Sequence, residues 1–254
     1  MHRYQLPVDA GATTASTPEA WAKEFAASTK SNARKRLRLR VSPEARLIRR
    51  HVPPGATILD AGCGFGDWVV FLRSAGYDAA GCDYSPELIR RLREAYPGME
   101  WTQADIRALP QTSGSIDAVV SWGVIEHDEA GPGAALREFH RVLRAGGTAI
   151  VTVPVDSAKA RQAELVFHHV EGRPHAFFQY LMSEEELRRE AESAGFKVLE
   201  SGTVAEAHIN HVAPRLARRL PGPLHRAAGL AAQLLLSWSE RYRVMLFAVL
   251  RKES

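Results

Sequence analysis

The sequence has few cysteines, no long apolar run and little acidic charge in two of its stretches. Its 254 residues include two cysteines, Cys63 and Cys82, which give no spacing for a metal site or a disulfide framework. We therefore expect no bound metal. No segment reaches the roughly 20 apolar residues of a membrane span, and the first residues lack the apolar core of a secretory signal. These absences predict a cytoplasmic protein without a transmembrane segment.

Acidic residues are scarce in two basic stretches. Residues 30–50 contain nine Lys and Arg but one acid, Glu44, and residues 208–239 contain no acid. Such runs are typical of proteins that bind nucleic acid or an anionic membrane, and also of solvated helix faces. Residues 30–50 contain no aromatic side chain that could stack on bases. A solvated helix face is therefore favoured, and nucleic acid is the less favoured partner.

A glycine-rich turn is the most informative local pattern. Residues 57–68, TILDAGCGFGDW, run from apolar residues through Asp60 into Gly62, Gly64 and Gly66, and then into an apolar helix. This order predicts a buried strand, a tight turn and a helix start. Glycines let the backbone bend and approach a ligand closely, and N–H groups at a helix start suit an anion. An ordinary glycine-rich turn of an α/β protein is the alternative.

Strands and helices alternate around this turn. Strands are predicted at 57–60, 77–82, 99–104, 116–121, 148–153, 196–204 and 244–250. Helices are predicted at 18–27, 31–51, 67–76, 85–96, 134–143 (closed by Gly146 and Gly147), 183–194 and 224–239. Residues 1–17 are expected to be poorly ordered. The alternation predicts a parallel sheet with helices on both faces, in which ligands bind at the carboxyl ends of the strands.

Acidic residues follow three successive predicted strands. Asp60, Asp83 and Asp105 each end a strand, and the loop 122–127 follows the fourth. Asp83 lies about 20 residues past the glycine turn, the distance at which an acid reaches a ribose diol. The pattern fits NAD or any other cofactor that contains adenosine.

Together these motifs resemble the class I S-adenosylmethionine-dependent methyltransferases. The resemblance covers residues 45–204 and the last strand, and it rests on ILDAGCGFGDW, Asp83, QADIRALP, IDAVVSWGVIEH, FHRVLRAGGTAIVTVP and MLFAVLRK. It implies an α/β, Rossmann-like sheet of seven strands, mostly parallel with the last strand antiparallel, and helices on both faces. N-terminal helices and a helical insertion before the last strand would be added to it.

The resemblance also implies a cofactor, S-adenosylmethionine, with S-adenosylhomocysteine as the product. The residues that match the family's cofactor motifs are Asp60, Ala61, Gly62 and Gly64 for the methionine part, Asp83 for the ribose, Tyr84, Asp105 and Ile106 for the adenine, and Trp122 and Gly123 beside the sulfonium. Trp122 is equally expected as a core residue.

The methyl acceptor is expected to be a small biosynthetic molecule, methylated on O, N or C. The aromatic cluster Phe177, Phe178 and Tyr180 suggests that it is aromatic or apolar. His127 is the candidate general base, and a structural role in the loop is equally open. His168, His169 and His175 are the alternative bases.

The expected domains are an N-terminal tail with cap helices, residues 1–51, and a methyltransferase domain, residues 52–254. Acceptor-side insertions are expected at 155–182 and 205–240. The apolar helix 224–239 would pack on the domain or form a homodimer contact, and a peripheral membrane contact is not favoured. Two further hypotheses stay open: a non-catalytic module that binds an adenosine ligand or nucleic acid, and a nicotinamide-dependent oxidoreductase, against which the G-x-G-x-G spacing argues.

Overall fold

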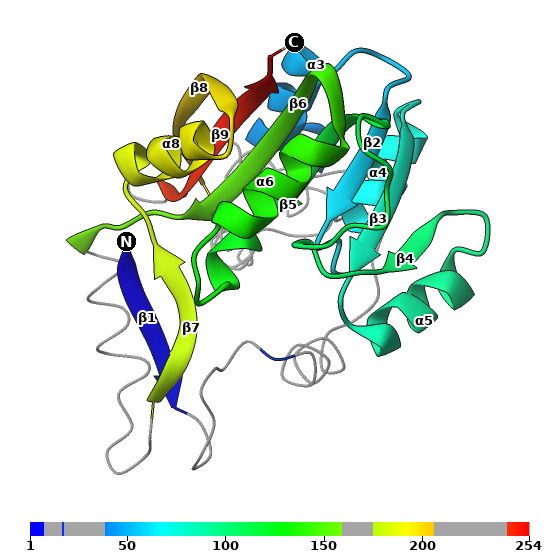
Figure 1. Ribbon diagram of the computed structural model, residues 1–254. Coiled ribbons are helices and arrows are strands. Elements are labelled where there is room, and N and C mark those ends of the chain that lie inside the picture. The colour runs from blue at the N-terminus through cyan, green and yellow to red at the C-terminus, as the bar shows by residue number, and fades with distance from the viewer. Residues whose placement is uncertain (8–16, 18–38, 159–174, 206–242, 254) are drawn as a thin grey trace, which may run out of the picture.

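A seven-stranded sheet forms the centre of the computed structural model, which describes residues 1–7, 17, 39–158, 175–205 and 243–253. Its strand order is β4-β3-β2-β5-β6-β9-β8 (Figure 1). The strands are β2 (Thr57–Ala61), β3 (Asp78–Asp83), β4 (Trp101–Gln103), β5 (Ile116–Trp122), β6 (Leu143–Pro154), β8 (Phe196–Ala205) and β9 (Arg243–Lys252). β9 is antiparallel to both of its neighbours, and the other pairs are parallel. The predicted Rossmann-like sheet with an antiparallel last strand is confirmed.

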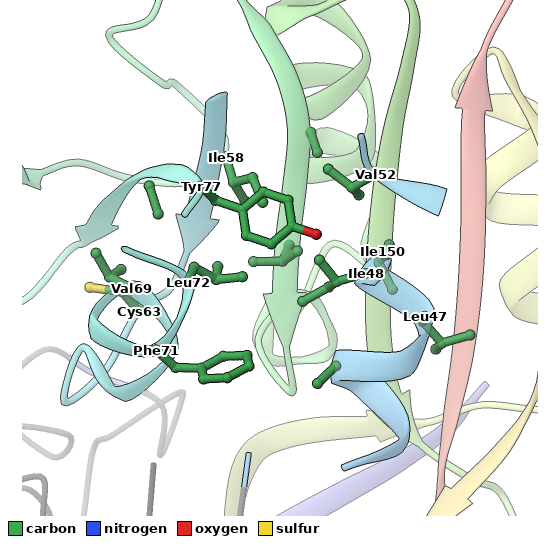
Figure 2. Close-up of a cluster of buried hydrophobic side chains, with 14 of the residues drawn as sticks. Leu47, Ile48, Val52, Ile58, Cys63, Val69, Phe71, Leu72, Tyr77 and Ile150 are labelled. Atoms are coloured by element: carbon green, nitrogen blue, oxygen red, sulfur yellow. The ribbon is translucent and has the colours of Figure 1, made fainter. Parts of the chain in front are cut away.

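Helices cover both faces of this sheet. One face carries α3 (Pro43–His51), α4 (Asp67–Ser74) and α5 (Pro86–Ala95), and the other carries α6 (Gly133–Val142) and α8 (Glu184–Ser193). Successive strand residues point to opposite faces, so Ile58 belongs to the first core cluster and Leu59 to the second. Figure 2 shows the first cluster, to which α3 contributes Ile48, α4 contributes Phe71 and β2 contributes Ile58. Among the described residues, no helix is long and apolar enough to cross a membrane.

Most observed helices start close to the predicted positions, but two predicted helices differ from the structure. The predicted helix 31–51 is interrupted at Ser42, whose Oγ accepts a hydrogen bond from Ala45 N at 3.1 Å. Pro43 follows it, and proline is tolerated only in the first turn of a helix. α6 ends at Val142, so Gly146 and Gly147 lie inside β6 and do not close the helix. The helices predicted at 18–27 and 224–239 lie outside the described residues.

A separate two-stranded sheet joins the start of the chain to the segment after Pro154. β1 (His2–Pro7) pairs antiparallel with β7 (His175–Leu181), beside the main sheet (Figure 1). β7 is linked to β6 through Met182, whose N–H donates to Pro154 O at 2.9 Å. The prediction of poor order was therefore wrong for residues 2–7, and no strand was predicted at 175–181. This pairing joins strands far apart in the sequence, so no local pattern shows it.

Candidate functional site

The candidate site lies where the strand order reverses. β3 and β4 follow on one side of β2, whereas β5 and β6 follow on the other. Ligands of such sheets bind in the crevice at the carboxyl ends of the strands at this point. Ala61 ends β2, Asp83 ends β3 and Trp122 ends β5. The hydroxyl of Ser121 donates to Ala61 O at 2.8 Å and ties the ends of β5 and β2 together.

The glycine turn is fastened to the end of β3. The N–H groups of Gly62 and Cys63 both donate to Cys82 O at 2.9 Å, and Gly64 N donates to Asp83 Oδ2 at 3.2 Å. Gly62 has φ +84°, a region that disfavours other residues. A Cβ at Gly62 would also lie 2.6 Å from both γ carbons of Val124. The turn therefore needs glycine for its conformation and for the close approach of the loop after β5.

Asp83 is a buried carboxyl held by backbone donors. Its Oδ1 accepts from Ser85 N at 3.0 Å, and its Oδ2 accepts from Gly64 N. Burial raises its pKa, while the N–H groups of Ser85, Gly64 and Tyr84 act in the opposite direction. A carboxylate has four lone pairs, so Asp83 can accept a further hydrogen bond beyond these three backbone donors. A carboxylate held in a fixed orientation suits a hydroxyl donor such as those of a ribose diol.

Asp60 is a buried carboxyl without a hydrogen-bond partner in the described part of the chain. It is 1% exposed, and both of its oxygens are buried. Burial, and then the nearby carboxyls of Asp83 and Asp67, raise the pKa of Asp60 to about 8. A cationic group would supply the missing partner, whereas a pyrophosphate would add negative charge to three acids. The site thus fits a cofactor with an ammonium and a sulfonium better than a dinucleotide.

Asp105 follows β4, next to the end of β3. Ala104 N donates to Asp83 O at 3.0 Å, which places the two strand ends together. The carboxylate of Asp105 accepts from Arg107, with Nη2 at 2.6 Å and the backbone N at 2.8 Å, and the side-chain bonds lower its pKa. Arg107 also reaches Asp128 at 3.4 Å. An adenine amino group would therefore share Asp105 with Arg107, a partner that sequence reasoning missed although it lies two residues away.

The neighbouring predicted residues Tyr84 and Ile106 are both half-buried at these strand ends. Ile106 packs against the core cluster on the α6 face of the sheet. Both positions are compatible with the predicted contacts to an adenine ring.

Trp122 stacks on a second tryptophan at the end of β5. The rings of Trp122 and Trp68 lie 4.9 Å apart at 30°. Trp68 is the second residue of α4, and sequence reasoning did not assign it although it ends the glycine motif. The indole N–H of Trp122 is buried and has no acceptor among the described residues. Trp122 therefore belongs to the core and borders the site beside Gly123.

His127 is hydrogen-bonded to the backbone of β7. Its Nδ1 lies 2.8 Å from Phe178 O, and because a carbonyl can only accept, Nδ1 carries the proton. Burial lowers the pKa of His127 to about 4, so the ring is neutral at pH 7 with Nε2 as an acceptor. The structural role in the loop is thus observed. The role of general base stays a prediction, and a group with this pKa is a weak base.

Glu126 is a second functional candidate, which sequence reasoning did not assign. The residue is 1% exposed, and its Oε1 lies 4.0 Å from His127 Nε2. Both residues belong to the short 3-10 helix η1 (Ile125–His127) that follows β5. The signal in the sequence that could have identified Glu126 is its position directly before His127.

The residues of the predicted aromatic cluster, Phe177, Phe178 and Tyr180, do not all pack against one another in the structure. Phe177 is 1% exposed and packs 4.9 Å from Tyr180, whereas Phe178 packs edge-on against His127. Of these three, Phe178 is therefore the one seen to contact a predicted site residue. His175 begins β7, and the alternative bases His168 and His169 lie outside the described residues.

Comparison with known proteins identifies relatives. Residues 58–147 match the family model described as "Methyltransferase domain". A Mycobacterium tuberculosis protein named "Probable S-adenosylmethionine-dependent methyltransferase" is 35% identical over 38% of this chain and 35% of its own length. The malonyl-[acyl-carrier protein] O-methyltransferase of Enterobacter lignolyticus is 32% identical over 54% of each chain. The matches thus span about a third to about half of these relatives.

Two solved structures have the same fold. One is the methyltransferase in complex with the Haloferax volcanii Trm112 methyltransferase activator, with a TM-score of 0.64, 23% identity, and coverage of 93% of this chain and 96% of that chain. The other is the Burkholderia thailandensis 1,6-didemethyltoxoflavin-N1-methyltransferase with S-adenosylhomocysteine bound, with a TM-score of 0.56, 19% identity, and coverage of 100% and 96%. At these identities the likeness concerns the fold.

Proposed function

We propose that this chain is a class I S-adenosylmethionine-dependent methyltransferase, and that it methylates O, N or C of a small, aromatic or apolar acceptor. S-adenosylmethionine, the cofactor of the family, supplies an activated methyl group, so the protein's work is binding, alignment and exclusion of water. The methionine part is proposed to be held by Asp60, Ala61, Gly62 and Gly64, and the ribose by Asp83. Tyr84, Asp105 and Ile106 are proposed to hold the adenine, and Trp122 and Gly123 to border the acceptor.

The unpartnered carboxyl of Asp60 is the observation that carries this proposal. A carboxyl that is 1% exposed and finds no hydrogen-bond donor in the described part of the chain needs a partner when it ionises. It lies at the end of β2, directly before the glycine turn. The α-ammonium of the cofactor is the kind of group that satisfies it, and a dinucleotide offers no such cation there. The same observation disfavours the nicotinamide-dependent oxidoreductase.

The acceptor class is supported by the side chains beside the site. Trp68, Trp122 and Phe178 present aromatic surface, and His127 is neutral at pH 7. The Burkholderia neighbour was solved with 1,6-didemethyltoxoflavin bound, and another relative is named trans-aconitate 2-methyltransferase, so these names support a small acceptor but not an aromatic or apolar one. Other relatives act on malonyl-[acyl-carrier protein], and a protein partner such as Trm112 occurs in the Haloferax complex. We favour a free small molecule because the aromatic surface suits a planar acceptor.

Isothermal titration with S-adenosylhomocysteine tests the cofactor site. We expect micromolar affinity for the unaltered chain and at least tenfold weaker binding by Asp83→Ala, because the ribose loses a charged acceptor. Glu87→Gln, on the exposed face of α5, is the matched control and should bind normally. Equal affinity of Asp83→Ala and the unaltered chain would contradict the site assignment, and binding of NAD in place of S-adenosylhomocysteine would restore the oxidoreductase hypothesis.

A further inference from the structure

One residue of β7 lies outside the regular pairing with β1. Tyr4 is opposite Gln179, and the next residue, Gln5, is opposite Phe177. Phe178 is therefore an extra residue on β7, which makes it a β-bulge. Bulges bend a strand, increase its twist and redirect groups, and they are frequent next to active sites.

The bulge residue contacts His127 with both its backbone and its ring. Phe178 O accepts the proton of His127 Nδ1 at 2.8 Å, and the two rings meet edge-on at 4.9 Å and 70°. On β1, the ring of Tyr4 lies 6.0 Å from that of Phe178, and Tyr4 is 8% exposed. Tyr4, Phe178 and His127 thus form a row from the first strand of the chain to the loop after β5.

A second set of contacts joins β1 and β7 to the same loop. Arg3 forms an ion pair with Glu129 and lies over the ring of Phe177, with 5.2 Å from Cζ to the ring centroid. The hydroxyl of Tyr180 donates to Glu129 O at 2.9 Å. Glu129 lies two residues after His127, so the two-stranded sheet holds this loop at two points.

We propose that β1 and the Phe178 bulge are a positioning element, which fixes His127 as the Nδ1–H tautomer so that Nε2 accepts a hydrogen bond from the methyl acceptor. The part that concerns the acceptor rests on the proposed function, whereas the tautomer is a property of the chain itself. An accepted hydrogen bond from an O–H or N–H orients the nucleophile's lone pair toward the methyl group. Tyr4 and Phe178 are therefore positioning residues, and neither is proposed to touch the reacting atoms.

Nitrogen-15 spectra of the imidazoles in the full chain test this inference. The chain has 10 histidines, so the His127 signals are assigned by difference from His127→Gln. We expect one tautomer in the unaltered chain, with Nδ1 protonated and Nε2 unprotonated. In Tyr4→Ala, and in a chain that lacks residues 2–7, we expect this single-tautomer pattern to be lost. Tyr4→Phe keeps the ring and should retain the pattern.

Two further measurements, of cofactor binding and of turnover, separate a change at His127 from a general loss of structure. β1 is not part of the seven-stranded sheet, so both variants should bind S-adenosylhomocysteine within about twofold of the unaltered chain. With a phenolic acceptor found by screening, Tyr4→Ala should lower kcat about tenfold, as one lost orienting bond predicts, and leave KM for the cofactor unchanged. A single tautomer that persists in both variants would overturn the inference. Failure of the unaltered chain to bind S-adenosylhomocysteine would instead contradict the proposed function.

Discussion

At the scale of single residues, the carboxyl of Asp60 links the stability of the protein to its ligand. Its pKa is about 8 in the folded chain against an ordinary 3.8, because it is buried beside Asp83 and Asp67. The unfolded chain releases this proton at lower pH than the folded chain. Stability from the neutral carboxyl is therefore complete below pH 3.8 and is lost as the pH rises to about 8.

We predict that Asp60→Asn stabilises the ligand-free protein at pH 8 but not at pH 4. The amide stays neutral, so the free energy of unfolding should exceed that of the unaltered chain by about 5 kcal/mol at pH 8. For a chain of this size, that corresponds to roughly 10–20 °C in melting temperature. Thermal melts at both pH values measure the difference. Equal destabilisation at pH 4 and pH 8 would contradict this account of Asp60.

We also predict that binding of S-adenosylhomocysteine at pH 7 releases close to one proton. Asp60 is protonated in the free protein and ionises when the ligand's ammonium reaches it. Titration calorimetry in phosphate and in Tris measures the release, because the two buffers differ in their enthalpy of ionisation. Asp60→Asn is the control and should give the same enthalpy in both buffers. A buffer-independent enthalpy for the unaltered chain would refute the pairing.

At the scale of elements, α8 depends on its first turn. Ser183 Oγ accepts from Glu186 N at 3.2 Å, and Ser183 N donates to Glu186 Oε2 at 2.9 Å. The side chain of each residue therefore accepts a hydrogen bond from the backbone N–H of the other. The helix buries Leu187 and Ala191 against the α6 face of the sheet. The observed start of α8 agrees with the helix predicted at 183–194.

We predict that Ser183→Ala lowers the free energy of unfolding by about 1 kcal/mol, the usual cost of losing such a cap. Glu185→Gln, an exposed residue of the same turn, is the matched control and should change it much less. Urea unfolding measures both variants. A loss for Ser183→Ala no larger than that for the control would show that tertiary packing alone holds this end of α8.

The sequence allowed the main sheet to be predicted, because its signals are local. Glycine turns, N-caps and apolar periods each occur within a few residues, and they place β2, α4, α5 and α8. The pairing of β1 with β7 was missed because it joins distant segments, and Pro7 and the polar residues of β1 give no strand signal. The same reason hides the bond from His127 to Phe178. The carboxyls that lie near Asp60 and the donors that hold Asp83 depend on strand order, which the family resemblance supplied.

At the scale of the whole molecule, several arginines of the described residues form ion pairs with acids. Arg50 pairs with Glu200, Arg90 with Glu87 and Glu94, and Arg141 with Glu138. Arg144 likewise pairs with Asp117. A guanidinium group that is paired with a carboxylate attracts a nucleic-acid phosphate less strongly than an unpaired one does. The arginines named here are therefore balanced by acids, whereas the net charge of +4 belongs to the full chain.

We predict that the protein does not bind duplex DNA or single-stranded RNA specifically at physiological salt. Fluorescence anisotropy with 20-mer probes at rising salt concentrations measures this, because binding through phosphates weakens steeply with salt. A lysine-rich protein of known DNA affinity serves as the positive control. Tight binding with a steep salt slope would instead support the nucleic-acid-binding hypothesis and assign it to the basic stretches.

The antiparallel strand β9 has a consequence for how the chain is made. β9 lies between β6 and β8, so β8 leaves the ribosome before the strand that joins it to the sheet. Until residues 243–252 emerge, β6 presents an open, apolar edge and β8 has no sheet neighbour. The nascent protein is therefore most prone to aggregation just before synthesis of these residues, and ribosomal stalling or a nonsense mutation there should send it to chaperones and proteases.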